Sequence, residues 1–341
     1  MFESRAAIIE KQGAPLVVDN IGLPALGVGQ CLVRVYASGI CGAQLNEIAG
    51  NKGPDRYLPH LMGHEGGGIV ESIGEGVSRV KPRDHVVLHW RKGAGIESAC
   101  PKYTRGDTFV GGGWVTTFQE YSVVSENRLT VIDESTPHDV AALMGCAVTT
   151  GMGVVFNEAR LQPGQSIAVI GCGGVGLSIV QAAALASAGN IAALDVQVSK
   201  LRMAAEFGAT REINLGDSWL GLKYITAYDV IVDTTGKPDL IAEAYHLVAP
   251  GGTVIMVGQP KRGEALVLPD VASDFKGKTL MDSTGGHTLP NEDIPRYLHL
   301  YRKGLLRIDK LITHRFPLER VNEALDTVRS GCAGRIILEM E

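Results

Sequence analysis

The sequence lacks any CxxC pair, although it contains six cysteines in 341 residues. The six are Cys31, Cys41, Cys100, Cys146, Cys172 and Cys332. Because they are scattered along a large chain, a disulfide framework of the kind found in small secreted domains is not expected. Most of these thiols should instead pack as small apolar side chains.

Long apolar runs and long basic runs are also missing. No stretch of about 20 residues is free of glycine and polar interruptions, so no membrane span is expected. The net charge of −5 and the lack of a basic cluster argue against nucleic acid as a partner. The first residues, MFESRAAIIEKQG, do not resemble a secretory signal. A cytoplasmic protein is the resulting expectation.

The length indicates two domains, because one core rarely grows to this size. Residues 1–147 contain short β-rich runs separated by turn signals, which predicts a barrel-like or sandwich domain. The expected strands are 5–9, 31–37, 68–73, 85–88 and 117–124. Residues 92–113 are rich in glycine and carry little periodicity, so they are predicted to form an irregular surface excursion.

Residues 148–284 alternate between strand-like and helix-like segments, which predicts a parallel sheet covered by helices on both faces. The expected strands include 229–233 and 252–258, with a helix at 240–247 between them. Residues 285–341 contain two amphipathic helical stretches, 291–303 and 318–329, and a final strand at 335–339.

Residues 166–195 carry the strongest local motif of the chain. A strand-like run leads into GCGGVG at 171–176, a helical stretch follows, and a second strand-like run ends on Asp195. In this context the first glycine permits the turn, the second lets a pyrophosphate approach and the third lets helix pack on strand. The N-terminus of the helix offers free N–H groups to the phosphates.

Asp195 bears on which dinucleotide would bind. It follows the first glycine by about 24 residues, close to the spacing of roughly 20 at which a carboxylate accepts the ribose hydroxyls. A carboxylate there repels a 2′-phosphate, so NAD is favoured over NADP. The alternative is a nucleotide-free βαβ unit with a glycine-rich turn.

Three residues carry a metal hypothesis, namely Cys41, His64 and Cys146. Two thiolates and one imidazole leave the fourth tetrahedral position open, as in catalytic zinc sites. This mixture of sulfur and nitrogen ligands suits zinc. Taken singly, each residue is more often structural, and spacing alone does not decide the matter.

The chain resembles the zinc-containing medium-chain alcohol and polyol dehydrogenase family over nearly its whole length. The matching stretches are SGICG, LMGHEGGGIVESIGEGVSRVKPRDHVV, GCAVTTGMG, LQPGQSIAVIGCGGVGLS, LITHRFPLERVNEALD and SGCAGRIIL. The resemblance implies an α/β fold with a GroES-like β-rich catalytic domain, 1–147 completed by 285–341, and a Rossmann domain, 148–284. It implies an active site in the cleft between them and a homodimer or homotetramer, with residues 251–268 ending in a sheet edge available for pairing.

The resemblance also assigns residues to ligands. One catalytic zinc would be held by Cys41, His64 and Cys146, with Glu65 included in the metal site as the acid beside the histidine. Thr150 and the backbone of Val257 and Gly258 would lie along the nicotinamide. The full cofactor set is Thr150, Gly171, Gly173, Gly174, Val175, Gly176, Asp195, Lys200, Val257, Gly258 and Arg335, where Lys200 would join Asp195 at the ribose and Arg335 would touch the pyrophosphate.

Two departures from the family pattern concern the structural zinc and the proton relay. The lobe at 91–113 contains only Cys100 where the family's structural zinc needs four cysteines, so a second zinc is predicted to be absent. The family's proton relay is replaced by Ala43, Gln44 and Asn46. The released proton would then leave through His89, a substrate hydroxyl, or the ribose with Asn46 and water.

A third departure concerns the substrate. The pocket position corresponds to Trp90, flanked by His89, Arg91 and Lys92, and His287 is a further candidate. This polar segment suits a small-molecule alcohol or ketone of sugar, cyclitol or polyol type. The alternatives are a phosphate- or phosphonate-bearing alcohol, cationic side chains that simply face water, and a NAD-binding protein without catalysis.

Overall fold

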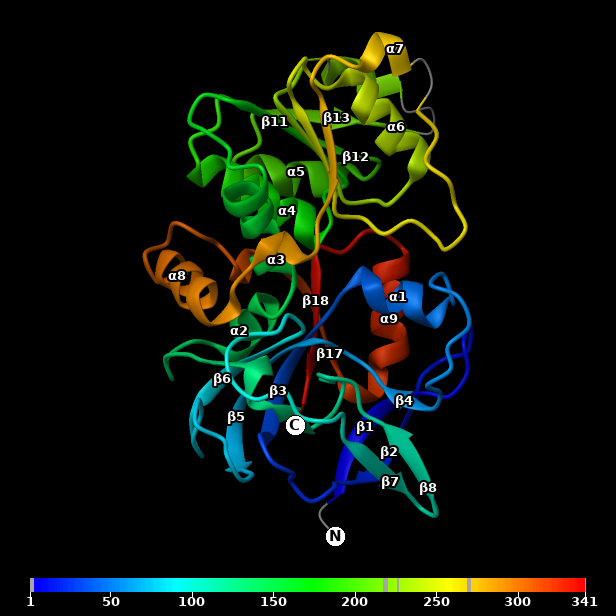
Figure 1. The fold of residues 1–341 in the computed structure, drawn as a ribbon, viewed down its shortest axis with the longest axis vertical. Coiled ribbons are helices and arrows are strands. Elements are labelled where there is room, and N and C mark those ends of the chain that lie inside the picture. Colours follow the sequence, from blue (N-terminus) through cyan, green and yellow to red (C-terminus); the bar gives the residue numbers. More distant parts are fainter. Residues whose placement is uncertain (1–2, 217–219, 226, 269–270, 341) are drawn as a thin grey trace. The chain divides into compact units, whose positions relative to one another are not determined.

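The computed structural model describes residues 3–216, 220–225, 227–268 and 271–340. The chain divides into two compact units (Figure 1). Unit 1 comprises Met1–Ala147, Leu289–Lys303 and Ile308–Glu341, and unit 2 comprises Val148–Thr288 and Gly304–Arg307. The first boundary lies where β-rich sequence gives way to alternating strand and helix. The predicted return at residue 285 lies inside unit 2, which continues to Thr288.

Unit 1 contains a closed barrel of five short strands. In barrel order these are β1 (Glu3–Ile9), β2 (Val17–Gly22), β7 (Lys102–Arg105), β8 (Thr108–Gly111) and β4 (His60–Leu61). Tyr103 is fully buried in its interior beside Ile8 and Val110. The expectation of an irregular segment at 92–113 was therefore wrong in part, because β7 and β8 form a hairpin inside it.

The larger sheet of unit 1 joins distant parts of the chain. Its order is β10 (Leu129–Val131), β6 (His85–His89), β5 (Glu65–Ile73), β3 (Gln30–Ile40), β18 (Arg335–Glu339) and β17 (Ile312–Pro317), and β9 (Tyr121–Ser125) also pairs with β3. The pairing of β18 with β3 brings the end of the chain to the centre of the unit. The strand expected at 117–124 begins only at Tyr121.

Four α-helices complete unit 1, together with short 3-10 turns. They are α1 (Gly42–Ile48), α2 (His138–Met144), α8 (Pro290–Arg302) and α9 (Val321–Arg329), and the turns are Glu126–Arg128, Asp309–Leu311 and Leu318–Arg320. The apolar residues of α9, which recur at helical spacing, are buried in the main core of the unit. The helix predicted at 318–329 thus begins with a 3-10 turn and ends where expected.

Unit 2 is built on a six-stranded sheet in which every neighbouring pair is parallel. Its order is β13 (Arg211–Asn214), β12 (Asn190–Asp195), β11 (Ser166–Ile170), β14 (Val230–Asp233), β15 (Thr253–Met256) and β16 (Thr279–Asp282). The order reverses direction after β11, which defines a doubly wound Rossmann-type sheet. The edge strands are β13 and β16, so the expectation that 251–268 forms the edge was wrong.

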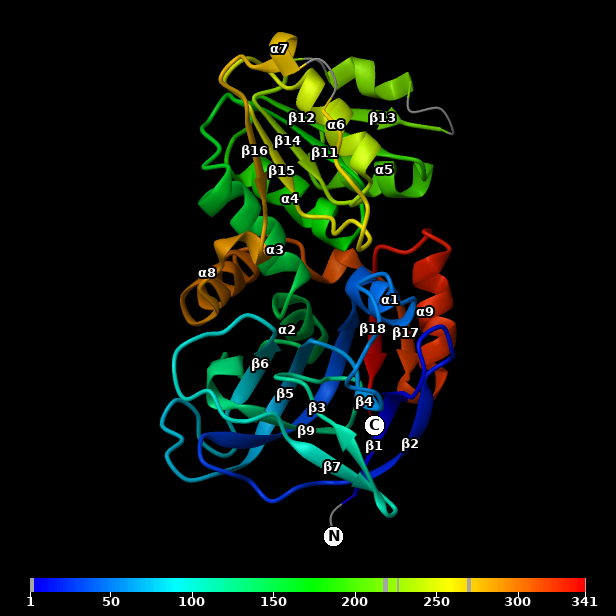
Figure 2. The same ribbon diagram turned by 45° about the vertical axis from the view of Figure 1, so that its right-hand side comes forward.

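Helices cover the sheet of unit 2 (Figures 1 and 2). The helices that contact its strands are α4 (Gly174–Leu185), α5 (Val198–Glu206) and α6 (Pro238–Leu247). Unit 2 also contains α3 (Ala147–Gly153) and α7 (Val271–Asp274), a π-helical turn at Val154–Glu158 and 3-10 turns at Leu220–Ile225 and Gly285–His287. One core cluster joins the strands to α6 through Leu240 and Ala244, while α4 packs beside α5. The predicted α/β class, with a β-rich unit and a doubly wound parallel sheet, is confirmed.

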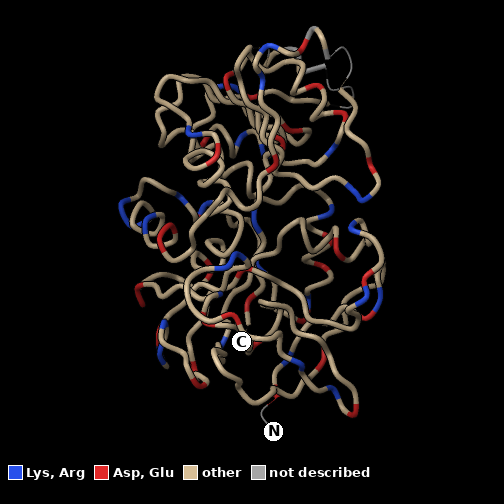
Figure 3. Tube along the Cα trace, viewed as in Figure 1, with Lys and Arg blue, Asp and Glu red and all other residues tan. Residues whose placement is uncertain are grey.

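Two further properties concern the surroundings of the chain. In the part of the chain that the structure describes, no single helix is long and apolar enough to cross a membrane, and one bent pair, His138–Met144 with Ala147–Glu158, passes on length and composition alone. Lysine and arginine alternate with acidic residues along the trace of each unit (Figure 3). The charges are therefore mixed rather than segregated by sign.

Candidate metal centre and dinucleotide site

Unit 1 brings together the three predicted metal ligands from separate elements. Cys41 directly follows β3 and caps the N-terminus of α1, His64 immediately precedes β5, and Cys146 follows α2. One ligand atom of each residue lies within 4.8 Å of those of the other two. The sheet and the two helices thus converge on one thiol–imidazole–thiol cluster.

The chemistry of this cluster fits a divalent metal ion such as zinc. His64 Nε2 is buried and has no hydrogen-bond partner. A hydrogen bond from Cys146, together with the neighbouring His64 and the charge of Arg335, holds the pKa of the Cys41 thiol well below its usual value against the effect of burial. A thiol whose deprotonation is favoured and a ring nitrogen without a protein partner suit zinc, which binds thiolate sulfur and imidazole nitrogen.

Gln44 connects the first two ligands. Its side-chain Oε1 accepts a hydrogen bond from the backbone N–H of Cys41 at 2.8 Å, and its Nε2 lies 2.6 Å from His64 Nδ1. The Gln44 side chain is 1% exposed. Gln44 therefore fixes both the start of α1 and the orientation of the imidazole ring.

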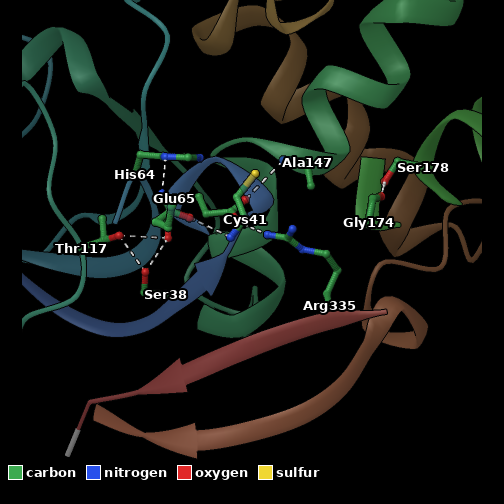
Figure 4. A network of polar contacts seen from close by, with 10 residues as sticks. Ser38, Cys41, His64, Glu65, Thr117, Ala147, Gly174, Ser178 and Arg335 are labelled. Carbon is green, nitrogen blue, oxygen red and sulfur yellow. Dashed lines mark hydrogen bonds and ion pairs between the residues drawn. The ribbon is translucent and has the colours of Figure 1, made fainter. Parts of the chain in front are cut away.

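Glu65 is not among the atoms that form the metal cluster, which corrects its inclusion as a ligand. Its fully buried carboxylate pairs with the guanidinium of Arg335 and accepts the backbone N–H of Ala147 at 3.3 Å (Figure 4). Arg335 also interacts with the Cys41 thiol, whose charge partly offsets the lowering of the Arg335 pKa by burial. The structure therefore places Arg335 in the metal centre of unit 1, and its predicted contact with a pyrophosphate stays a proposal.

A second cluster in unit 1 contains Glu47, Asp55 and His60, whose ligand atoms also lie within 4.8 Å of one another. The His60 ring lies 2.8 Å from Asp55 through Nε2 and 2.8 Å from the carbonyl of Leu61 through Nδ1. Both ring nitrogens of His60 therefore have a hydrogen-bond partner within the protein. This cluster was not expected from the sequence, because the acids and the histidine have no recognisable spacing.

His89 is not placed as a proton relay. Its Nδ1 donates to the carbonyl of Arg91 at 2.7 Å, and its Nε2 lies 3.0 Å from the hydroxyl of Thr130, which in turn accepts from Asn291 Nδ2. The side chain is 1% exposed, and burial lowers its pKa from 6.5 to about 4. With both ring nitrogens engaged and a depressed pKa, His89 has the environment of a structural histidine, so the relay expectation is corrected.

The rest of the polar segment is also held by the protein. Trp90 packs half-buried against the core of unit 1, with the guanidinium carbon of Arg91 5.6 Å from its ring centroid. Lys92 Nζ lies 2.5 Å from a carboxylate oxygen of Glu97, and Arg128 binds the other oxygen at 2.9 Å. Because Lys92 is already paired, the segment gives little support to the alternative of an anionic substrate.

The lobe without a cysteine cluster is attached by a buried carboxylate. Glu126 accepts the backbone N–H groups of Ile96, Ser78 and Arg79 at 2.8–2.9 Å. Burial by itself would raise the pKa of Glu126, but these three donors outweigh it and hold the pKa below its usual value. No local motif predicted this role of Glu126, and Cys100 is exposed. The absence of a structural zinc stays a prediction that this attachment supports.

The glycine-rich turn of unit 2 has the geometry of a phosphate cradle. Gly171 has φ of 92°, and a Cβ at Gly176 would lie 1.9 Å from the carbonyl oxygen of Gly171. A Cβ at Gly173 would meet no protein atom within 4 Å. Two glycines are thus required by the chain itself, while the third leaves open space before Gly174 and Val175 at the start of α4.

Asp195 ends β12 beside this turn and is 8% exposed. One carboxylate oxygen accepts the backbone N–H of Cys172 at 2.7 Å, and the other accepts that of Gln197 at 2.8 Å. A carboxylate has about four acceptor positions, so it can still accept ribose hydroxyls. Lys200 lies on α5, near enough to Cys172 for its positive charge to lower the pKa of that thiol, although burial raises this pKa by more.

The remaining predicted contacts lie in unit 2. Thr150 is 6% exposed on α3, and Val257 and Gly258 follow β15, where both backbone N–H groups bond the Asp233 carbonyl. His287 has φ of 46° and lies 3.2 Å from a carboxylate oxygen of Glu158. Their contacts with nicotinamide or substrate stay proposals.

Comparison with known proteins agrees with both halves of this description. The domain family "Alcohol dehydrogenase GroES-like domain" matches residues 27–134, and the family "Zinc-binding dehydrogenase" matches residues 174–303. Alcohol dehydrogenase 1 of Trifolium repens is 28% identical over 377 residues, covering 100% of this chain and 98% of that protein. An S-(hydroxymethyl)glutathione dehydrogenase of Escherichia coli is 29% identical over 369 residues, covering 99% and 100%.

Solved structures match in fold over the full length. An alcohol dehydrogenase zinc-binding domain protein from Burkholderia ambifaria has a TM-score of 0.89 at 28% identity, covering 100% of this chain and 99% of that one. Benzyl alcohol dehydrogenase from Acinetobacter calcoaceticus has a TM-score of 0.88 at 25% identity, with 100% of both chains covered. The chain belongs to the zinc-containing medium-chain dehydrogenases, an oxidoreductase family that uses zinc and NAD(P).

Proposed function

We propose that this protein is a dehydrogenase with one catalytic zinc per chain that transfers hydride between a secondary alcohol and NAD. The observation that carries the proposal is the cluster of Cys41, His64 and Cys146, whose three ligand atoms converge while one ring nitrogen stays unpartnered. Three protein ligands leave one tetrahedral position for a substrate oxygen. In such a site the metal supplies Lewis acidity and the nicotinamide accepts the hydride.

The residues of the chain would divide the remaining work. Cys41 and Cys146 supply thiolates, and Gln44 orients the ring of His64. In unit 2 the open space at Gly173 admits the pyrophosphate, and Asp195 favours a ribose that carries no phosphate. NAD rather than NADP is therefore the proposed cofactor.

The proposed substrate is a secondary alcohol of sugar, cyclitol or polyol type, or the matching ketone. Ala43 has no hydroxyl to pass a proton, and His89 is engaged on both ring nitrogens. A substrate with neighbouring hydroxyl groups would bring its own proton carrier to the site. We also propose a cytoplasmic homodimer or homotetramer, as the family resemblance suggests.

A panel of alcohols with NAD or NADP tests this proposal directly. Zinc-loaded protein should form NADH with a cyclitol or sugar alcohol at a higher kcat/KM than with ethanol, and NADP should be the poorer cofactor. A sugar phosphate preferred at low salt would favour the anionic alternative. Protein that binds NAD and zinc yet oxidises no alcohol in either direction would contradict the proposed activity.

A further inference from the structure

The hydrogen bonds of Gln44 determine which ring nitrogen of His64 acts as the acceptor in this arrangement. The Gln44 Oε1 is occupied by the Cys41 N–H, so its NH₂ group faces His64 Nδ1 at 2.6 Å. Because an amide NH₂ only donates, Nδ1 must accept, and the ring proton must lie on Nε2. Nε2 is the buried nitrogen without a partner in the thiol cluster.

Metal binding requires the opposite tautomer. A neutral imidazole ligates through a bare lone pair, so the ring proton must move to Nδ1 if Nε2 is to bind the metal. Nδ1–H is then a donor, and the Gln44 NH₂ group that faced it is also a donor. The bond seen in this structure therefore cannot persist when His64 ligates through Nε2.

Turning the amide does not remove the conflict. Once His64 carries a proton on Nδ1, two N–H groups need the same Gln44 oxygen, one on the ring and one on the backbone of Cys41. The two N–H groups face different ends of the Gln44 amide: the Cys41 N–H faces Oε1, and His64 Nδ1 faces Nε2. Satisfying His64 leaves the Cys41 N–H at the start of α1 facing an NH₂ group.

We propose that Gln44 is a positioning residue that weakens and gates metal uptake, because binding at His64 must break the contact between Gln44 and the N-terminus of α1. This inference rests on the metal site of the proposed function. A metal-ligating histidine ordinarily donates its other N–H to a carboxylate or carbonyl, and removing such a partner costs about 10–100-fold in metal affinity. In this chain the Gln44 oxygen already accepts the backbone N–H of Cys41.

The isosteric substitution Gln44→Glu is the direct test. A glutamate has the same length, and its two oxygens can accept the Cys41 N–H and the His64 Nδ1–H together. The full-length chain, stripped of metal and titrated with zinc against a chelator, should bind roughly 10–100-fold more tightly as Gln44→Glu than as wild type. Asn46→Asp is the matched control, because it adds the same charge on α1 and keeps the acceptor for Asn51.

Hydrogen exchange at the Cys41 amide supplies a readout that does not depend on any substitution. In wild type this N–H should be protected without metal and lose protection when zinc binds, whereas in Gln44→Glu it should stay protected in both states. Unchanged protection in wild type on zinc binding would overturn the inference. So would a Gln44→Glu affinity no higher than that of Asn46→Asp.

The two levels of the proposal can fail separately. Wild-type protein that takes up no zinc would contradict the metal site itself, and with it the proposed function. Wild-type protein that binds zinc with an unaltered Cys41 amide would contradict only the role of Gln44.

Discussion

Glu65 and Arg335 form an ion pair across 270 residues of sequence, with side chains 0% and 4% exposed. The pair lies beside the Cys41 thiol, with which Arg335 also interacts. Gly39 makes room for it, because a Cβ there would come within 2.6 Å of Glu65 Oε1 and 2.9 Å of Arg335 Nη2. The strand pairing of β18 with β3 therefore serves the metal centre as well as the sheet.

Glu65→Gln should destabilise the fold strongly, because it leaves the Arg335 charge buried without its partner. Breaking a buried pair in this way costs about 3–5 kcal/mol. Urea unfolding should show the loss as a lower midpoint at an unchanged slope. The control is Glu319→Gln. Glu319 pairs with Arg5, and both side chains are exposed. Such a surface pair contributes about 0–1 kcal/mol to stability. An equal loss of unfolding free energy in Glu65→Gln and Glu319→Gln would contradict a stabilising role of the buried pair.

Gly39→Ala should destabilise unit 1 and disturb the same pair through its added methyl group. Overpacking of a filled site costs roughly 1–3 kcal/mol. Gly42→Ala is a close control, since a Cβ there would meet no atom within 4 Å. The two variants can be compared by thermal unfolding of the metal-free chain. A Gly39→Ala protein as stable as Gly42→Ala would show that the space beside Glu65 is not required.

The environment of His89 predicts a dependence of stability on pH. Its pKa is lowered from 6.5 to about 4 by burial, so between these values the unfolded imidazole binds a proton that the folded one does not. The contribution of His89 to the free energy of unfolding is therefore complete above pH 6.5. As the pH falls toward 4, the free energy of unfolding drops by up to about 3 kcal/mol. His89→Asn should remove that part of the slope in urea unfolding between pH 7 and 4.

The same variant tests whether His89 carries protons in turnover. Since its ring nitrogens are bonded to Arg91 and Thr130, His89→Asn should keep the shape of the pH–rate profile. Loss of one limb of that profile would restore His89 as a relay. A shift in stability with an unaltered profile supports the structural role.

Asp195→Gly should relax the preference for NAD over NADP. The substitution removes the negative charge that would oppose a 2′-phosphate, so the ratio of kcat/KM for the two cofactors should move toward NADP. Asp195→Asn separates this effect from the loss of the backbone contacts with Cys172 and Gln197, because the amide oxygen can keep one of them. A wild-type preference for NADP would contradict the role given to Asp195.

Regular elements were predictable where the local pattern agreed with burial. The strand predicted at 335–339 forms β18 over the same residues, and the strand, helix and strand predicted within 166–195 form β11, α4 and β12. The hairpin of β7 and β8 was missed because the segment that contains it, 92–113, is rich in glycine. Tyr103 anchors this hairpin, because its side chain is fully buried and its hydroxyl accepts the Val123 N–H.

Motifs in the sequence predicted the metal ligands of the site but not the residues that hold them in place. The cluster of Cys41, His64 and Cys146 follows from residue types and the family pattern, but their hydrogen-bond partners do not. His89 is held through Thr130 by Asn291, which is 161 residues from that threonine. Arg335 is directed to Glu65 by pairing of strands from opposite ends of the chain. Such long-range contacts leave no local signal in the sequence.

The metal content of purified chain tests the central claim most directly. Wild type, prepared without chelators and measured by elemental analysis, should carry about one zinc per chain, as the three-ligand site requires. Cys146→Ser should lose most of that zinc and its turnover while it keeps the wild-type circular dichroism, and Cys332→Ser, at an exposed thiol, should keep both. A wild-type chain without zinc, or a Cys146→Ser protein with full zinc and activity, would contradict the account.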